Sequence, residues 1–204
     1  MHPSEPTPDA SFCTTLYRAD PHPVRPVDLI LVGCTNTPSS LPLCTRRNPA
    51  LVLNAIHEAA GTRRSVAYAS HFNPRLKSIG VHYVVDVTGE VWLGRHLDEP
   101  SAVNPVYDQR AIAITLVGHG NRYTRAQWSS LRGLVLWRSH HAGIALQTPL
   151  RTSDQSKPDG WDWRNGIAHH RVGLADQEHD QPGPALQQWL LHGLVPRPAQ
   201  LTDY

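Results

Sequence analysis

Histidine is the residue type whose number most invites a chemical interpretation, because thirteen histidines occur among the 204 residues of this sequence. An imidazole nitrogen binds zinc readily, and the ring can give or take a proton near neutral pH. Several histidines lie in or beside apolar runs, among them His82, His119 and the adjacent pair His169 and His170. The count therefore raises the question of a metal site.

Length and composition predict one globular domain with no affinity for nucleic acid. Hydrophobic residues make up 40% and charged residues 18%, which suits one well-filled core in a soluble protein. The formal charge is only +2, and the pI is about 8.5. A nucleic-acid-binding surface needs clustered lysine and arginine, whereas a slight basic excess is mildly favourable for approaching an anionic polymer.

The sequence predicts a cytoplasmic protein that does not enter a membrane. Its first residues contain no apolar run able to form the core of a signal peptide, and no later stretch approaches the length of a membrane span. Export or release by a route that the sequence does not encode is the alternative. The three cysteines, Cys13, Cys34 and Cys44, show no paired spacing, which predicts free or buried thiols rather than a disulfide framework.

The elements that must position the histidines begin with a strand and a helix. Residues 27–33 form a continuous apolar run that ends in Gly33, which is typical of a buried central strand. Residues 49–60 start with a proline and are followed by Gly61, a pattern that predicts a helix. His57 is expected on a partly exposed face of that helix.

A hairpin and a second strand–helix pair are predicted next. Residues 80–87 and 90–95 read as two strands joined at Thr88–Gly89, and residues 111–118 as another buried strand. Thr124 can cap a helix over residues 125–142 that Gly143 stops. The apolar positions of this helix recur at helical spacing and are expected in the core: Trp128, Leu131, Leu134, Val135 and Trp137.

The C-terminal third is predicted to hold a polar surface loop over 148–165, a short strand over 166–172 and a helix that starts near Pro184 and ends near Leu191. This order of elements predicts an α/β fold, a mixed central β-sheet flanked by helices. Three parts are expected along the chain: a proline-rich arm over 1–26, a domain over 27–195 and a tail over 196–204.

Four stretches in this order resemble the zinc-dependent N-acetylmuramoyl-L-alanine amidases, a family that includes phage lysins, bacterial muropeptide amidases and peptidoglycan recognition proteins. The stretches are 79–103, 111–120, 123–138 and 167–186. The resemblance implies the amidase / peptidoglycan-recognition-protein fold. It also implies hydrolysis of the amide between N-acetylmuramic acid and L-alanine, with a zinc ion that activates water.

The resemblance assigns three zinc-ligand positions, and this sequence fills them incompletely. The first ligand of the family is a histidine at the end of the first strand, where Gly33 stands here. The second is matched by His170, and the third by Asp180 or, counting back from Pro182, by Gln181. Cys34 is expected on the opposite face of the strand from Gly33. His179 lies near the place where many members have a lysine that assists the oxyanion, and is the candidate catalytic residue.

Three more pocket positions depart from the family pattern. A tyrosine is replaced by Val81, a histidine by Val103, and the glutamate of bacterial members by Thr115. His82, Asn104 and Trp161 are the candidate substrate-binding residues. Further candidates for the groove are Trp163, Arg63, Arg64 and Arg75.

Three hypotheses follow from this partial match. The first is an active amidase with a rearranged zinc site, in which His82, His119 or His179 joins His170 and Asp180. The second, which the four departures favour, is a degenerate amidase that still binds peptidoglycan or a muropeptide while zinc and hydrolysis are lost or impaired. The third is an amidase scaffold that has become a regulator and binds a protein partner, for which the proline-rich arm is available.

Overall fold

The computed structural model of the protein describes residues 23–37, 48–119, 122–148, 150–153, 161–169, 183–198 and 201. Five strands form the central sheet in the order β3-β2-β4-β1-β7. Their bounds are Leu29–Cys34 (β1), Tyr83–Val85 (β2), Val91–Leu93 (β3), Ala111–Leu116 (β4) and Gly166–His169 (β7). Strand β3 is antiparallel to β2, and the other pairings are parallel, so the sheet is mixed as predicted.

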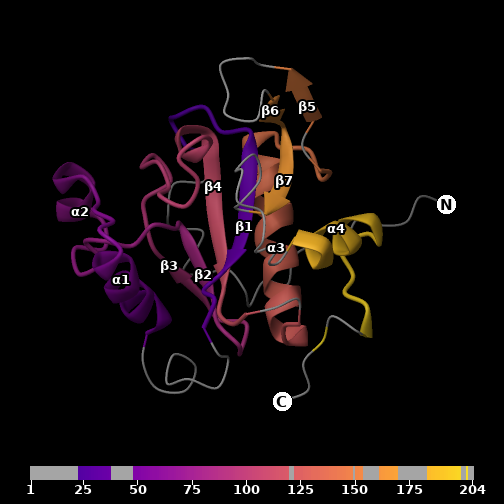
Figure 1. Ribbon diagram of the computed structural model, residues 1–204, viewed down its shortest axis with the longest axis horizontal. Coiled ribbons are helices and arrows are strands. Elements are labelled where there is room, and N and C mark those ends of the chain that lie inside the picture. Colours follow the sequence, from indigo (N-terminus) through magenta and orange to yellow (C-terminus); the bar gives the residue numbers. More distant parts are fainter. Residues whose placement is uncertain are drawn as a thin grey trace.

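Helices cover both faces of this sheet (Figure 1). The α-helices among the described residues are Pro49–Ala59 (α1), Val66–His71 (α2), Arg125–Ala142 (α3) and Gly183–Leu191 (α4), and a 3-10 turn, Asp108–Arg110 (η2), precedes β4. Side chains of α3 and α4, including Trp128 and Trp189, pack against the face that carries Ile30 and Ile114. Leu53 of α1 belongs to a second apolar cluster with residues of the opposite face.

The two longer helices begin and end where their sequence signals lie. The Asn48 side chain accepts a hydrogen bond from the Ala50 N–H at 2.9 Å, and Pro49 occupies the first turn of α1. Thr124 and Gln127 form a reciprocal capping box at the start of α3, and Gly143 ends it in the left-handed conformation. The five predicted core residues of α3 are all buried, which confirms the helical assignment.

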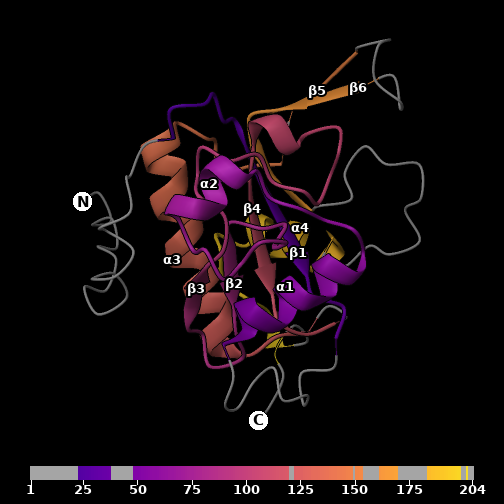
Figure 2. The same ribbon diagram turned by 90° about the vertical axis from the view of Figure 1, so that its left-hand side faces the viewer.

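Two predictions of local structure were wrong. Residues 148–165 are not a loop throughout, because Leu150–Ser153 (β5) and Trp161–Arg164 (β6) pair as an antiparallel ribbon. Figure 2 shows this ribbon reaching away from the rest of the domain. The strands of the predicted hairpin are also shorter than expected, three residues each. No helix among the described residues combines the length and apolarity that a membrane span requires.

Candidate functional site

A cavity of about 210 Å³ lies beside the carboxyl-terminal halves of β1 and β4, between these strands, α1 and the loop before η2. This is the edge at which sheets with parallel strands commonly bind ligands. Its walls combine apolar side chains with polar atoms and come from five parts of the chain. The lining residues are Leu31, Gly33, Cys34, Thr35, Leu53, Ile56, His57, Val81, Ala102, Val103, Ala113, Ile114 and Thr115.

Gly33 and Thr115 lie opposite each other in the β1–β4 register and line this cavity together. Because side chains alternate along a strand, Cys34 must point to the other face. It packs there against the core cluster of α3, and its thiol interacts with the Tyr123 hydroxyl. Burial raises the pKa of the Cys34 thiol. The expected orientation of Cys34 is therefore confirmed.

The structure brings together all four positions at which the sequence departs from the amidase pattern. Gly33, Val81, Val103 and Thr115 are separated by up to 82 residues in the chain, and each lines the same cavity. Val81 and Thr115 are 2% and 6% exposed, so both are firmly part of the wall. Gly33 has no side chain to offer, and the two valines and the threonine are not ligands that zinc prefers.

His57 lines the cavity and was missed as a site residue by the sequence reasoning. Its Nδ1 accepts a hydrogen bond from the Gly80 N–H at 2.7 Å, so the ring proton must lie on Nε2. Burial, and then the charge of Arg95, lower the pKa of His57 and favour this neutral form. The only available clue was its spacing four residues after Leu53, which places both on one face of α1.

The described residues of the cavity do not fit a zinc ion. Gly33 has no side chain, and although Cys34 borders the cavity, its side chain packs against the core cluster of α3 on the other face of the sheet. His57 could bind zinc through Nε2 only if the proton moved to Nδ1, where the Gly80 N–H already points. No group of three potential metal ligands gathers among the described residues, and His170, His179, Asp180 and Gln181 lie outside them.

The loop that supplies Ala102 and Val103 is held by one carboxylate. Asp108 Oδ1 accepts hydrogen bonds from the Ser101 hydroxyl at 2.6 Å and from the Val103 and Asn104 N–H groups at 3.0 Å each. Asn104, a candidate substrate-binding residue, is fully buried, and its Oδ1 accepts a hydrogen bond from the Val106 N–H. In this structure Asn104 shapes the loop and does not line the cavity.

His82, the second candidate substrate-binding residue, is also fully buried. Its Nδ1 accepts a hydrogen bond from the Ala113 N–H at 2.9 Å, so the ring proton lies on Nε2. This Nε2–H group donates a hydrogen bond to the Glu99 carbonyl at 2.8 Å. Burial, followed by the charge of Arg25, holds the pKa of His82 well below its usual value. The ring thus connects β4 to the loop instead of lining the cavity.

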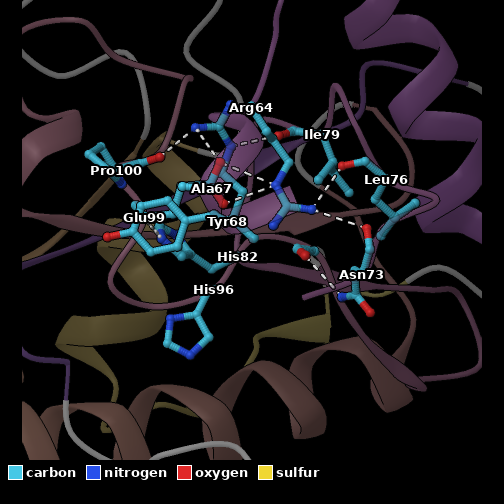
Figure 3. A network of polar contacts seen from close by, with 12 residues as sticks. Arg64, Ala67, Tyr68, Asn73, Leu76, Ile79, His82, His96, Glu99 and Pro100 are labelled. Atoms are coloured by element: carbon cyan, nitrogen blue, oxygen red, sulfur yellow. Dashed lines mark hydrogen bonds and ion pairs between the residues drawn. The ribbon is translucent and has the colours of Figure 1, made fainter. Parts of the chain in front are cut away.

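Arg64 does not line a groove, contrary to prediction, because it belongs to a buried ion cluster (Figure 3). Its Nε lies 2.9 Å from Glu99 Oε2, and Arg95 Nη1 lies 3.5 Å from the other carboxylate oxygen. Arg64 Nη1 also donates to the Asn73 and Leu76 carbonyls. These contacts connect the segment around α2 to the cavity loop, whereas Arg63 and Arg75 are exposed.

The third candidate substrate-binding residue, Trp161, begins β6 and pairs in register with Ser153. Trp163 pairs with Arg151 in the same ribbon. The side chains of both tryptophans lie outside what the structure describes, so substrate binding by Trp161 stays a prediction. His119 follows β4 and is exposed, so it does not join the cavity.

Comparison with known proteins identifies the family. A family model described as N-acetylmuramoyl-L-alanine amidase matches residues 24–184. Because this match covers most of the chain, the protein belongs to the N-acetylmuramoyl-L-alanine amidase family. Among curated protein sequences, no significant match is found.

Solved structures show the same fold at low sequence identity. The amidase LysC from Clostridium intestinale is 15% identical with a TM-score of 0.51, covering 75% of this chain and 76% of LysC. Drosophila peptidoglycan recognition protein SA is 15% identical with a TM-score of 0.53, covering 89% and 84%. Peptidoglycan recognition protein LE, solved with tracheal cytotoxin, a monomeric diaminopimelic acid-type peptidoglycan, is 15% identical with a TM-score of 0.53, covering 82% of each chain. At this identity the likeness shows the fold, which agrees with the predicted one.

Proposed function

We propose that this protein binds peptidoglycan or a muropeptide at the N-acetylmuramic acid–L-alanine junction, and that its zinc-dependent hydrolysis is lost or impaired. The observation that carries the proposal is the meeting of Gly33, Val81, Val103 and Thr115 in one cavity. Family membership supports a peptidoglycan-directed ligand, and the solved complex of a recognition protein with a peptidoglycan monomer supports binding as a role for this fold.

The cavity is chemically suited to the uncharged junction between the sugar and the peptide. The lactyl group of muramic acid and the alanine residue each present a methyl group, which the apolar walls formed by Leu53, Val81 and Val103 can cover. The amide between them presents a carbonyl oxygen. His57 in its neutral form keeps an Nε2–H donor for such an oxygen, because its Nδ1 is already bound to Gly80.

The same residues explain why hydrolysis is proposed to be weak. Cleavage of an amide requires an activated water and a group that stabilises the oxyanion. Thr115 cannot act as a carboxylate base, and Gly33 cannot hold a metal that would lower the pKa of water. A site limited to His170 and Asp180 would bind zinc weakly, since losing a direct ligand is expected to cost more than the roughly 10–100-fold of losing an outer hydrogen-bond partner.

Binding and catalysis can be tested separately on the full chain. Sedimentation with purified sacculi and calorimetry with a soluble muramyl tripeptide should show binding that persists at moderate salt. Metal analysis of protein purified without chelators or a histidine tag should show less than stoichiometric zinc, and release of free peptide from sacculi should be absent or very slow. Protein that stays in the supernatant and ignores the tripeptide would contradict the binding role. Stoichiometric zinc with rapid cleavage would instead establish an active amidase with a rearranged site.

A further inference from the structure

A single arginine just ahead of β1 contacts both ends of the segment that forms one wall of the cavity. Arg25 Nε donates to the Leu97 carbonyl at 2.6 Å. Its Nη1 donates to the Gln109 carbonyl at 2.9 Å, and its Nη2 to the Ala111 carbonyl at 2.6 Å. The guanidinium therefore connects the first residue of the 97–111 segment to its last residues.

The surroundings of Arg25 strengthen this bridge. The Val24 N–H donates to Asp98 Oδ1 at 2.5 Å, so the neighbouring backbone holds the same end of the segment. Asp98 and Asp108 raise the pKa of Arg25, and burial, the larger influence, lowers it to about 10. Arg25 therefore stays charged at neutral pH, and a charged donor makes the stronger type of hydrogen bond to a carbonyl oxygen.

The bridged segment contributes two residues to the cavity wall. Ala102 and Val103 line the cavity, and their backbone N–H groups are fixed by the Gly80 carbonyl at 2.8 Å and by Asp108 at 3.0 Å. Asp108 is adjacent to Gln109, whose carbonyl Arg25 holds. A displacement of this end would therefore move the carboxylate that sets the position of Val103.

We infer that Arg25 is a positioning residue for ligand binding, because it fixes both ends of the 97–111 segment and thereby the Ala102–Val103 wall of the cavity. The segment that precedes the first strand then acts on affinity without touching the ligand. The inference takes the identity of the ligand, a muropeptide, from the proposed function.

Hydrogen–deuterium exchange of the full chain tests the positioning without any ligand. In Arg25→Ala, the amides of residues 97–111, Val103 and Asn104 among them, should exchange at least about tenfold faster, while those of β1, α3 and residues 112–116 of β4 keep their rates. Arg122→Ala is the matched control. Arg122 is exposed and also bonds a carbonyl, that of Leu201, but it has no contact with the segment. Arg25→Lys keeps the charge but carries its donors on one nitrogen instead of the three that Arg25 uses, and should lie between the parent and Arg25→Ala.

Calorimetry with muramyl tripeptide then connects the wall to the ligand. We expect Arg25→Ala to bind about tenfold more weakly, Arg25→Lys to recover part of that loss, and Arg122→Ala to match the parent. Unchanged exchange over 97–111 in folded Arg25→Ala, or equal effects in Arg122→Ala, would overturn the inference. If Arg25→Ala does not fold, Arg25→Lys decides by the same criteria. Faster exchange over 97–111 together with no tripeptide binding by the parent would refute the proposed ligand and leave the positioning role supported.

Discussion

Gly33 on β1 is the direct register partner of Thr115 on β4, so the two residues face the same cavity from neighbouring parallel strands. The resemblance drawn from the sequence predicts that these are the positions of a zinc-binding histidine and, in bacterial members, of a glutamate. The pairing means that two departures from the pattern act on one small volume. A substitution at either position should therefore change metal binding or ligand binding in this cavity.

Restoring the first ligand should reveal whether the rest of the zinc site survives. Gly33→His is expected to raise bound zinc towards one ion per chain, because a third ligand would join His170 and Asp180. Metal analysis of the purified variant gives the measurement, and peptide release from sacculi gives the activity. Adding His170→Ala to this variant should remove the gain. A Gly33→His protein that folds but gains no zinc would show that the other ligands are not arranged for a metal.

Removing the imidazole from the cavity should weaken ligand binding. His57→Ala loses the Nε2–H donor and part of the wall, and we expect about tenfold weaker binding of muramyl tripeptide, the equivalent of one hydrogen bond. Glu58→Ala is a suitable control, since its side chain is 57% exposed on the same helix. Equal affinities for the parent and His57→Ala would exclude a contact between His57 and the ligand.

Breaking the buried ion cluster should cost much of the stability of the domain. Glu99→Gln leaves Arg64 and Arg95 buried without their anion, and we expect a loss of about 3–5 kcal/mol in the free energy of unfolding. Urea denaturation measures the change. Arg63→Ala removes an exposed arginine from the adjacent position and should change stability by less than about 1 kcal/mol. A loss of similar size in both variants would contradict the role of the cluster.

Acid should destabilise the protein through buried neutral histidines. The pKa of His82 is lowered well below its usual value in the folded state, chiefly by burial, and that of His57 is lowered as well. In the unfolded chain both rings take up protons as the pH falls through about 6.5, which favours unfolding. Stability should therefore be complete above that pH and fall below it, by up to about 1.4 kcal/mol per pH unit for each histidine.

Urea midpoints between pH 7.5 and 5.0 check this dependence. His82→Gln cannot titrate, so its stability should fall less steeply over the same range even if it is less stable at pH 7.5. Equal slopes for the parent and His82→Gln would show that His82 does not contribute to the acid sensitivity.

The sequence predicts best those elements whose signals are local. The apolar runs of β1 and β4 and the capped helix α3 are readable because strand alternation, helical spacing and the Thr124 and Gly143 caps all lie within the element. Helix α2 is different, since Val66 is 83% exposed and none of the six residues is buried. No apolar stripe marks it. Strands β5 and β6 were missed for another reason, because four residues each are too few for alternation to mark a strand within a turn-rich stretch.

Candidate site residues are harder to predict, because the exposure of a polar side chain depends on partners far away in the sequence. Arg64 is buried by Glu99, 35 residues later, and His82 by Ala113, 31 residues later. No local sequence pattern indicates these pairings, so the sequence predicted that Arg64 and His82 could contact a ligand. The family resemblance was a better guide to which residues share a pocket, because it compares positions along a common fold. It grouped Gly33, Val81, Val103 and Thr115, and all four line the cavity.

Asp108 holds the cavity loop mainly through backbone N–H groups, so the loop can keep its shape when its side chains change. The hydrogen bonds to Val103 and Asn104 do not depend on which side chains those residues carry. A histidine, a valine or another residue at position 103 can therefore occupy the same backbone. The lining of the cavity at position 103 can therefore change while the hydrogen bonds that hold the loop backbone stay in place.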